Sequence, residues 1–157
     1  MKTRRDVLVG IGVIGTTALA GCGDVLGSDG PTDAVEGYIT AANDRDVDAV
    51  NAVLHPESAS YPIEEGDFPD DEIKINEIEE TSIEEFVQWR SGRSGGELKG
   101  EELDSAVEDQ RQGIREQVEA IGADDFAFVF LSITQGSEDN ETYLLVVEDD
   151  GEWLVYI

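Results

Sequence analysis

The sequence FAFVFLSITQGSEDNETYLLVVEDDGEWLVYI, residues 126–157, is rich in strand-forming residues and is interrupted by two turn signals. Residues 126–133 are almost wholly apolar, which is typical of a central strand that is covered on both faces. The polar residues 136–140 predict a turn, and Asp149-Asp150-Gly151 predicts a hairpin between strands at 141–148 and 152–157. We therefore expect three consecutive antiparallel strands here.

Two short helices are predicted ahead of these strands. Pro31 suits the first position of a helix, and apolar residues then recur at helical spacing up to Ala42. Asp46 is a suitable N-cap for a second helix. His55-Pro56 is expected to end that helix, because the residue before a proline avoids helical geometry. Residues 57–71 contain prolines and acidic residues and are predicted to form a loop.

The middle of the chain continues this mixed pattern. A strand is predicted at residues 72–79, with a bulge because Ile78 is out of phase with the apolar residues before it. Ser82-Ile83-Glu84-Glu85 is a capping box that predicts the start of a short helix. Four glycines make residues 90–100 the most flexible internal segment in our prediction. Helical spacing returns at residues 101–121, where a glycine follows as a stop signal.

These elements predict an α+β domain over residues 31–157, in which a curved antiparallel sheet of about four strands wraps on N-terminal helices. Three short segments resemble the opening of the nuclear transport factor 2-like superfamily: YITAAN (38–43), DVDAV (46–50) and LHP (54–56). Residues 143–156 are similar to the final hairpin of that fold. That superfamily includes SnoaL-like cyclases and ketosteroid isomerases. The resemblance implies a cone that is open at one end.

The first 22 residues have the features of a secretion signal. Arg4 and Arg5 precede an uncharged run, and TRRDVL resembles a twin-arginine signal. The run is shorter than the roughly 20 apolar residues of a membrane-spanning helix. LAGC at residues 19–22 matches the lipobox of secreted lipoproteins, in which the cysteine carries the lipid. We predict a signal peptide at residues 1–21, lipidated Cys22 with a short tether at 22–30, and lipid anchoring to the outer face of the cell membrane.

The charge balance is strongly acidic. The chain has 37 acidic and 10 basic residues, and removal of the signal leaves 36 and 7, a net charge of −29. A lysine-poor acidic surface resembles that of proteins from salt-loving archaea, because molar salt reduces the Debye length to about 3 Å and screens self-repulsion. Nucleic acid is excluded as a partner, since binding it requires a basic face.

Three residues are candidates for a site in the cone. Enzymes of the superfamily use a carboxylate or His as base and a Tyr or protonated Asp as oxyanion donor, as in ketosteroid isomerase. Tyr38, His55 and Tyr143 are therefore the candidate pocket residues. The structural alternatives are a core position for Tyr38 and a helix-end role for His55. No residue is predicted to be catalytic, and no metal or cofactor is predicted, because one His and one lipidated Cys cannot supply a zinc site.

Two functional classes follow from these observations. The first is a non-catalytic domain that binds a small apolar ligand or a partner protein at the cell surface. The alternative is a small SnoaL-like isomerase, cyclase or dehydratase that uses a carboxylate or His base. The first is preferred, because the inward strand positions are Phe, Val, Leu and Ile, whereas an enzyme of this kind needs a polar pair inside the cone.

Overall fold

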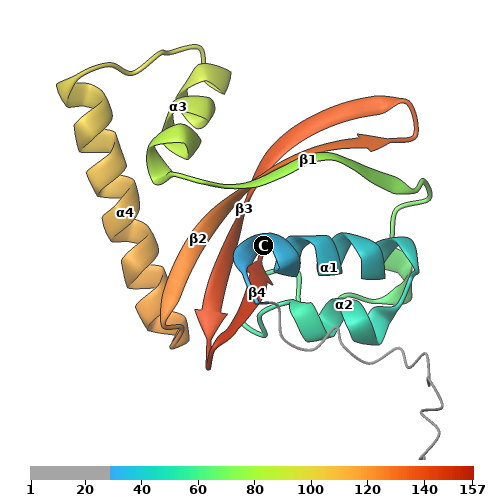
Figure 1. The fold of residues 1–157 in the computed structure, drawn as a ribbon. Coiled ribbons are helices and arrows are strands. Elements are labelled where there is room, and N and C mark those ends of the chain that lie inside the picture. The colour runs from blue at the N-terminus through green and yellow to red at the C-terminus, as the bar shows by residue number, and fades with distance from the viewer. Residues whose placement is uncertain (1–28) are drawn as a thin grey trace, which may run out of the picture.

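The computed structural model describes residues 29–157, which form an α+β domain with four α-helices and one antiparallel sheet of four strands (Figure 1). The strands lie in chain order across the sheet, and the sheet is open. The elements follow one another as α1 (Pro31–Asn43), α2 (Val47–Val53), β1 (Ile73–Thr81), α3 (Ile83–Arg93), α4 (Glu101–Ile121), β2 (Asp125–Gln135), β3 (Glu138–Asp149) and β4 (Glu152–Tyr156). This confirms the predicted class and the four-stranded antiparallel sheet.

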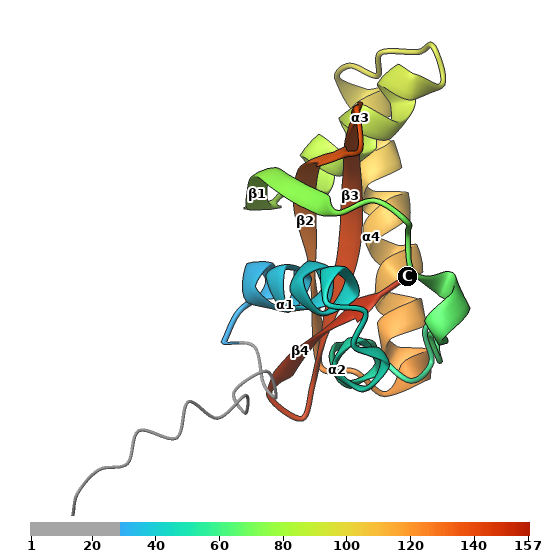
Figure 2. The same ribbon diagram turned by 90° about the vertical axis from the view of Figure 1, so that its right-hand side faces the viewer.

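Different pairs of helices cover the two faces of the sheet (Figures 1 and 2). On β2, Val129 and Leu131 face α1, whereas Phe126 and Phe128 pack in the cluster that includes α4. The side chains alternate because successive residues of a strand point to opposite faces. The prediction that residues 126–133 form a central strand covered on both faces is therefore confirmed.

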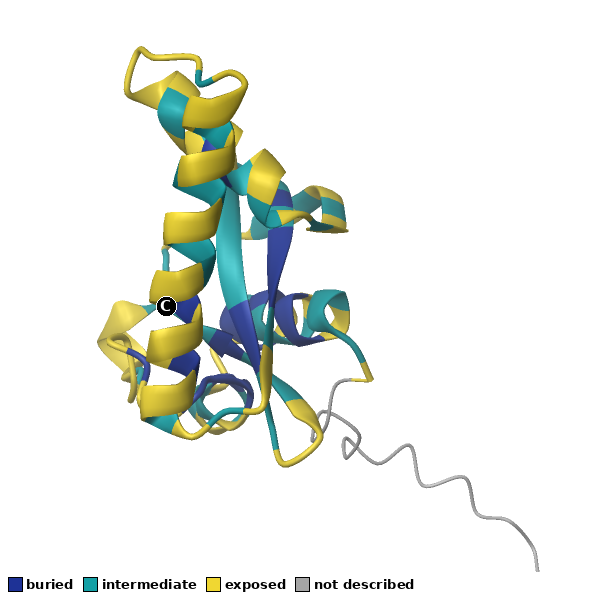
Figure 3. Cartoon of the chain, turned by 90° about the vertical axis from the view of Figure 1, so that its left-hand side faces the viewer, coloured by how far each residue is buried: buried dark blue, intermediate teal, exposed yellow. Residues whose placement is uncertain are grey.

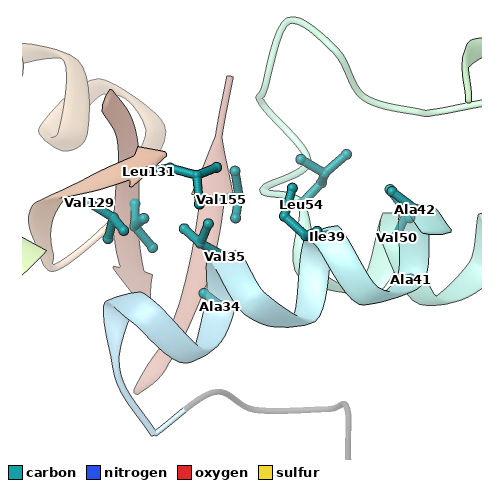
Figure 4. Close-up of a cluster of buried hydrophobic side chains, with 11 residues drawn as sticks. Ala34, Val35, Ile39, Ala41, Ala42, Val50, Leu54, Val129, Leu131 and Val155 are labelled. Carbon is teal, nitrogen blue, oxygen red and sulfur yellow. The ribbon is translucent and has the colours of Figure 1, made fainter. Parts of the chain in front are cut away.

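The larger core lies between α1 and the sheet (Figure 4). Val35 of α1 and Val129, Val146 and Val155 of three strands are all 0 % exposed. Burying each valine side chain contributes about 1.5–3 kcal/mol relative to an exposed one. The space between α1 and the sheet is consequently occupied by close-packed side chains.

A second, smaller core joins α4 to the opposite face of the sheet. Ile114 and Val118 of α4 pack with Phe128 of β2 and Val147 of β3. The remaining faces of α4 are mostly exposed (Figure 3). No helix within residues 29–157, α4 included, combines the length and the apolar character that a membrane crossing requires.

The local signals in the sequence mark most of the element boundaries. Asp46 Oδ1 accepts a hydrogen bond of 3.0 Å from the Ala49 N–H and caps α2. Ser82 and Glu85 form the predicted capping box of α3. Gly122 follows α4 in the left-handed region, at a φ of 80°. The predicted bulge in β1 is also present, between Ile75 and Glu77.

Two asparagines attach the chain between α2 and β1 to the N-terminal helices, one at the middle of this connection and one at its end. The Asn51 side chain accepts a hydrogen bond from the Ile63 N–H at 2.8 Å and donates one to the Ile63 carbonyl at 3.0 Å. Asn43 makes the same pair of bonds with Ile73, both at 2.8 Å. Each amide thus imitates a neighbouring strand, and both half-buried backbone segments have their polar groups satisfied.

Three expected boundaries are wrong. Residues 90–93 belong to α3. Arg90 and Arg93 occupy its last turn, where their positive charges interact favourably with the helix dipole. The turn after β2 is shorter than residues 136–140, because strand pairing continues to Gln135 and Glu138. Finally, α2 ends before Leu54, which instead forms a parallel bridge with Val155 of β4.

Candidate functional site

The three predicted pocket residues lie in three separate places. Tyr38 packs against the core between α1 and the sheet. Tyr143 lies on the opposite face of the sheet, in contact with aromatic side chains of α3. His55 lies beside β4, in the segment that follows α2. The structure therefore does not bring them into one site, and Arg4, Arg5 and Cys22 lie outside the described residues.

His55 is a buried structural residue. It is 2 % exposed, and its backbone N–H donates to the Val155 carbonyl at 2.9 Å. Its Nδ1 accepts a hydrogen bond from the Glu57 N–H at 3.1 Å, so the proton of the neutral ring is on Nε2. Nε2 lies 3.5 Å from Oδ2 of Asp149. Both ring nitrogens are thus engaged, and neither is free to act as a base.

The expected helix-end role of His55 is wrong for the same reason. Its imidazole contacts the Glu57 N–H, Asp149 and, in an edge-to-face arrangement with ring centroids 5.8 Å apart, Tyr156, rather than carbonyls of α2. Ser58 supports the same arrangement: its hydroxyl donates to the Ile157 carbonyl and accepts from the Ile157 N–H at 3.1 Å. Residues 54–60 are therefore attached to β4.

Tyr38 and Tyr143 both keep their phenolic protons more firmly than an exposed tyrosine. Burial raises the pKa of Tyr38. The pKa of Tyr143 is raised by partial burial and, to a smaller extent, by the negative charges of Glu85, Glu79 and Glu141. Neither hydroxyl is paired with a base in a shared cavity, so these shifts describe local surroundings rather than an acid–base pair.

An aromatic cluster surrounds Tyr143. Its ring centroid lies 4.8 Å from that of Trp89, 5.7 Å from that of Phe86 and 5.3 Å from that of Phe130. The guanidinium carbon of Arg93 lies 5.0 Å from the Trp89 ring centroid, within the range of a cation–π contact. These rings meet Tyr143 in tilted or edge-to-face arrangements, and the contacts of Trp89 and Phe86 attach α3 to the sheet.

A concave feature lies on the other side of α3. An open groove of about 450 Å³ runs between α3 and α4, within the size range of small-molecule sites. Its lining includes Val87, Arg90, Leu98, Ala106, Asp109 and Gln110. Arg90 Nη1 donates a hydrogen bond of 2.9 Å to Gln110 Oε1 across the groove. The groove therefore combines apolar walls with a few charged and polar groups.

The α3–α4 region also differs from the rest of the domain in charge. Residues 90–115 contain five basic and six acidic residues, whereas the other described residues contain two basic and twenty-nine acidic ones. The former segment is nearly neutral, and the latter carry a net charge of −27. This segregation was visible in the sequence and is the signal that could have identified the region.

The groove is remote from the start of the domain. In both Figure 1 and Figure 2 the connection between α3 and α4 lies at the top, while α1 lies in the lower half. Within residues 29–157, no group of three or more His, Cys, Asp or Glu side chains is arranged to hold a metal ion.

Comparisons with protein families, curated proteins and solved structures found no match for this chain. The geometry of the domain and the pattern of the sequence are thus the basis for assigning a function.

Proposed function

We propose that this protein is a lipoprotein, anchored through Cys22 to the outer face of the cell membrane, whose domain binds a small, partly apolar ligand without catalysing a reaction. The observation that carries the binding function is the groove of about 450 Å³ between α3 and α4. Apolar walls with a few polar groups are typical of sites for small molecules. The lipobox LAGC at residues 19–22 supports the anchor.

The arrangement of the three candidate pocket residues supports binding rather than catalysis. A general base must reach the proton that it removes, with a free acceptor atom. His55, the one histidine of the chain, has both ring nitrogens engaged, and Tyr38 and Tyr143 lie on opposite faces of the sheet. The isomerase, cyclase or dehydratase alternative is therefore less favoured.

We also propose that the domain is a divergent nuclear transport factor 2-like domain whose cone is filled. Two N-terminal helices, a sheet that curves past α1 and a final β3–β4 hairpin support this relation (Figure 1). The buried valines between α1 and the sheet occupy the place of the cavity. An experimental structure in which the sheet encloses α1 as in that superfamily would bear out the relation, and a flat sheet would contradict it.

The binding function can be tested by filling the groove. Ala106 lines the groove, whereas Ala120 is exposed on the same helix outside it. We expect uncharged apolar fragments to shift backbone NMR signals of residues 87–113 in the wild type and in Ala120→Trp. Ala106→Trp should abolish these shifts, because the indole occupies the groove.

Three results would contradict or relocate the proposed binding site, or show a disturbed fold. Fragments that shift no signals of residues 87–113, or that bind equally to both tryptophan variants, would remove the groove as a ligand site. Capture of a protein partner that survives Ala106→Trp would instead place binding on another surface. Thermal unfolding of both variants shows whether either substitution has disturbed the fold.

A further inference from the structure

We propose that the ligand of the α3–α4 groove is a short apolar peptide with free termini, whose carboxylate binds Arg90 and whose ammonium group binds Asp109. This inference rests on the proposed binding function and names the chemical class of the ligand. Val87, Leu98 and Ala106 supply the apolar wall for the peptide side chains.

The arrangement of charge in the groove is the first argument. Arg90 and Asp109 both line it, yet across the whole described chain neither takes part in a salt bridge. The hydrogen bond of Arg90 goes to the neutral amide of Gln110 at 2.9 Å. A guanidinium group has five N–H donors, so Arg90 retains donors for a carboxylate. Two opposite charges thus border one groove without neutralising each other, and a ligand with both charges complements them.

The charge of the whole protein is the second argument. Where the salt is dilute enough to leave it unscreened, a net charge of −29 on the mature chain repels an anionic ligand at long range. A purely cationic ligand finds acidic side chains over most of the surface and has no reason to select this groove. A zwitterion has no net charge, so it avoids the repulsion, and its two ends recognise the local pair of charges.

The size of the groove favours a peptide over a single amino acid. About 450 Å³ is well within the range of sites that hold drug-sized ligands. A dipeptide or tripeptide of apolar residues fills more of this volume, and its termini are farther apart than those of one amino acid. That separation suits two charged groups that do not contact each other.

Leucyl-leucine and two modified forms test this proposal by calorimetry on the folded domain in concentrated potassium chloride. N-acetyl-leucyl-leucine lacks the ammonium group, and leucyl-leucine amide lacks the carboxylate. Each modification should weaken binding about tenfold, because each removes a charge-assisted hydrogen bond. In Asp109→Asn, acetylation should have no further effect, and in Arg90→Gln, amidation should have none.

Arg115→Gln is the matched control, because Arg115 lies on α4 with Asp109, is exposed and lines a different concave surface. It should leave all three affinities unchanged. Binding that ignores the termini, or that falls equally in Arg115→Gln and Arg90→Gln, overturns the zwitterion proposal. If apolar fragments still occupy the groove in that case, the proposed binding function stands; if neither peptides nor fragments shift signals of residues 87–113, both fail.

Discussion

Replacement of His55 by alanine should destabilise the domain by about 2–4 kcal/mol. The side chain is 2 % exposed, and its removal leaves the half-buried Glu57 N–H without an acceptor, which costs about 1–3 kcal/mol. Loss of the ring contact with Tyr156 adds about 0.5–1.5 kcal/mol. The pair with Asp149 adds little, because that carboxylate is 38 % exposed and 3.5 Å away.

Urea unfolding followed by circular dichroism, at one fixed concentration of potassium chloride, measures this loss. His55→Asn should lose least, because its Oδ1 can take the place of Nδ1 and accept from the Glu57 N–H. His55→Gln should lose more, since its amide extends toward Asp149 instead. An exposed residue at a helix end would cost only about 0.3–1 kcal/mol. A loss below 1 kcal/mol for the alanine variant, or a glutamine variant more stable than the asparagine variant, would refute the buried arrangement.

Four other changes test separate parts of the account. Cys22→Ser should release the protein from membranes or block its maturation. A variant that stays firmly on membranes and still partitions into detergent would contradict lipid anchoring. The unfolding midpoint should rise steeply with potassium chloride, because salt screens a net charge of −29; a flat series would show that the acidic surface is no adaptation to salt. Asn51→Ala should cost about 1–3 kcal/mol in urea unfolding, because both polar groups of Ile63 lose their partners, and Asn51→Asp should cost less, since it can still accept; equal stability of all three proteins would argue against this role. The raised pKa of Tyr143 places its ionisation above pH 10, so stability should fall as the pH rises beyond that value, where the unfolded chain loses its proton first; an ultraviolet titration in which Tyr143→Phe removes a step at or below pH 10 would contradict it.

The parts of the fold that sequence alone predicts are those controlled by neighbouring residues. The N-cap at Asp46, the capping box at Ser82 and the left-handed Gly122 depend on atoms within a few positions of one another. The hairpin at Asp150-Gly151 depends on the positive φ values of 52° and 84° that these residues adopt. Their chemistry is complete in a short stretch of chain, so the sequence is sufficient.

The parts that sequence missed depend on contacts between distant segments. Whether α2 continues to His55 is decided by the Leu54–Val155 bridge, which joins residues about one hundred positions apart. The glycines of residues 90–100 favour a flexible segment locally, yet Arg90 lies in α3 and bonds to Gln110 of α4. No periodicity or composition of a single segment contains this information.

The same reasoning explains why the proposed site lies away from the cone that the resemblance implies. A cone requires small or polar inward residues to leave a cavity, and here β2, β3 and β4 direct Val129, Val146 and Val155 at α1. These side chains are fully buried, so the α1 side of the sheet is a rigid support. The long helix α4 and its partner α3 instead create a second concave surface, beyond the core and away from the start of α1 (Figure 1). Because that surface is also the least acidic part of the domain, it is where the carboxylate of a ligand meets the weakest repulsion from acidic side chains.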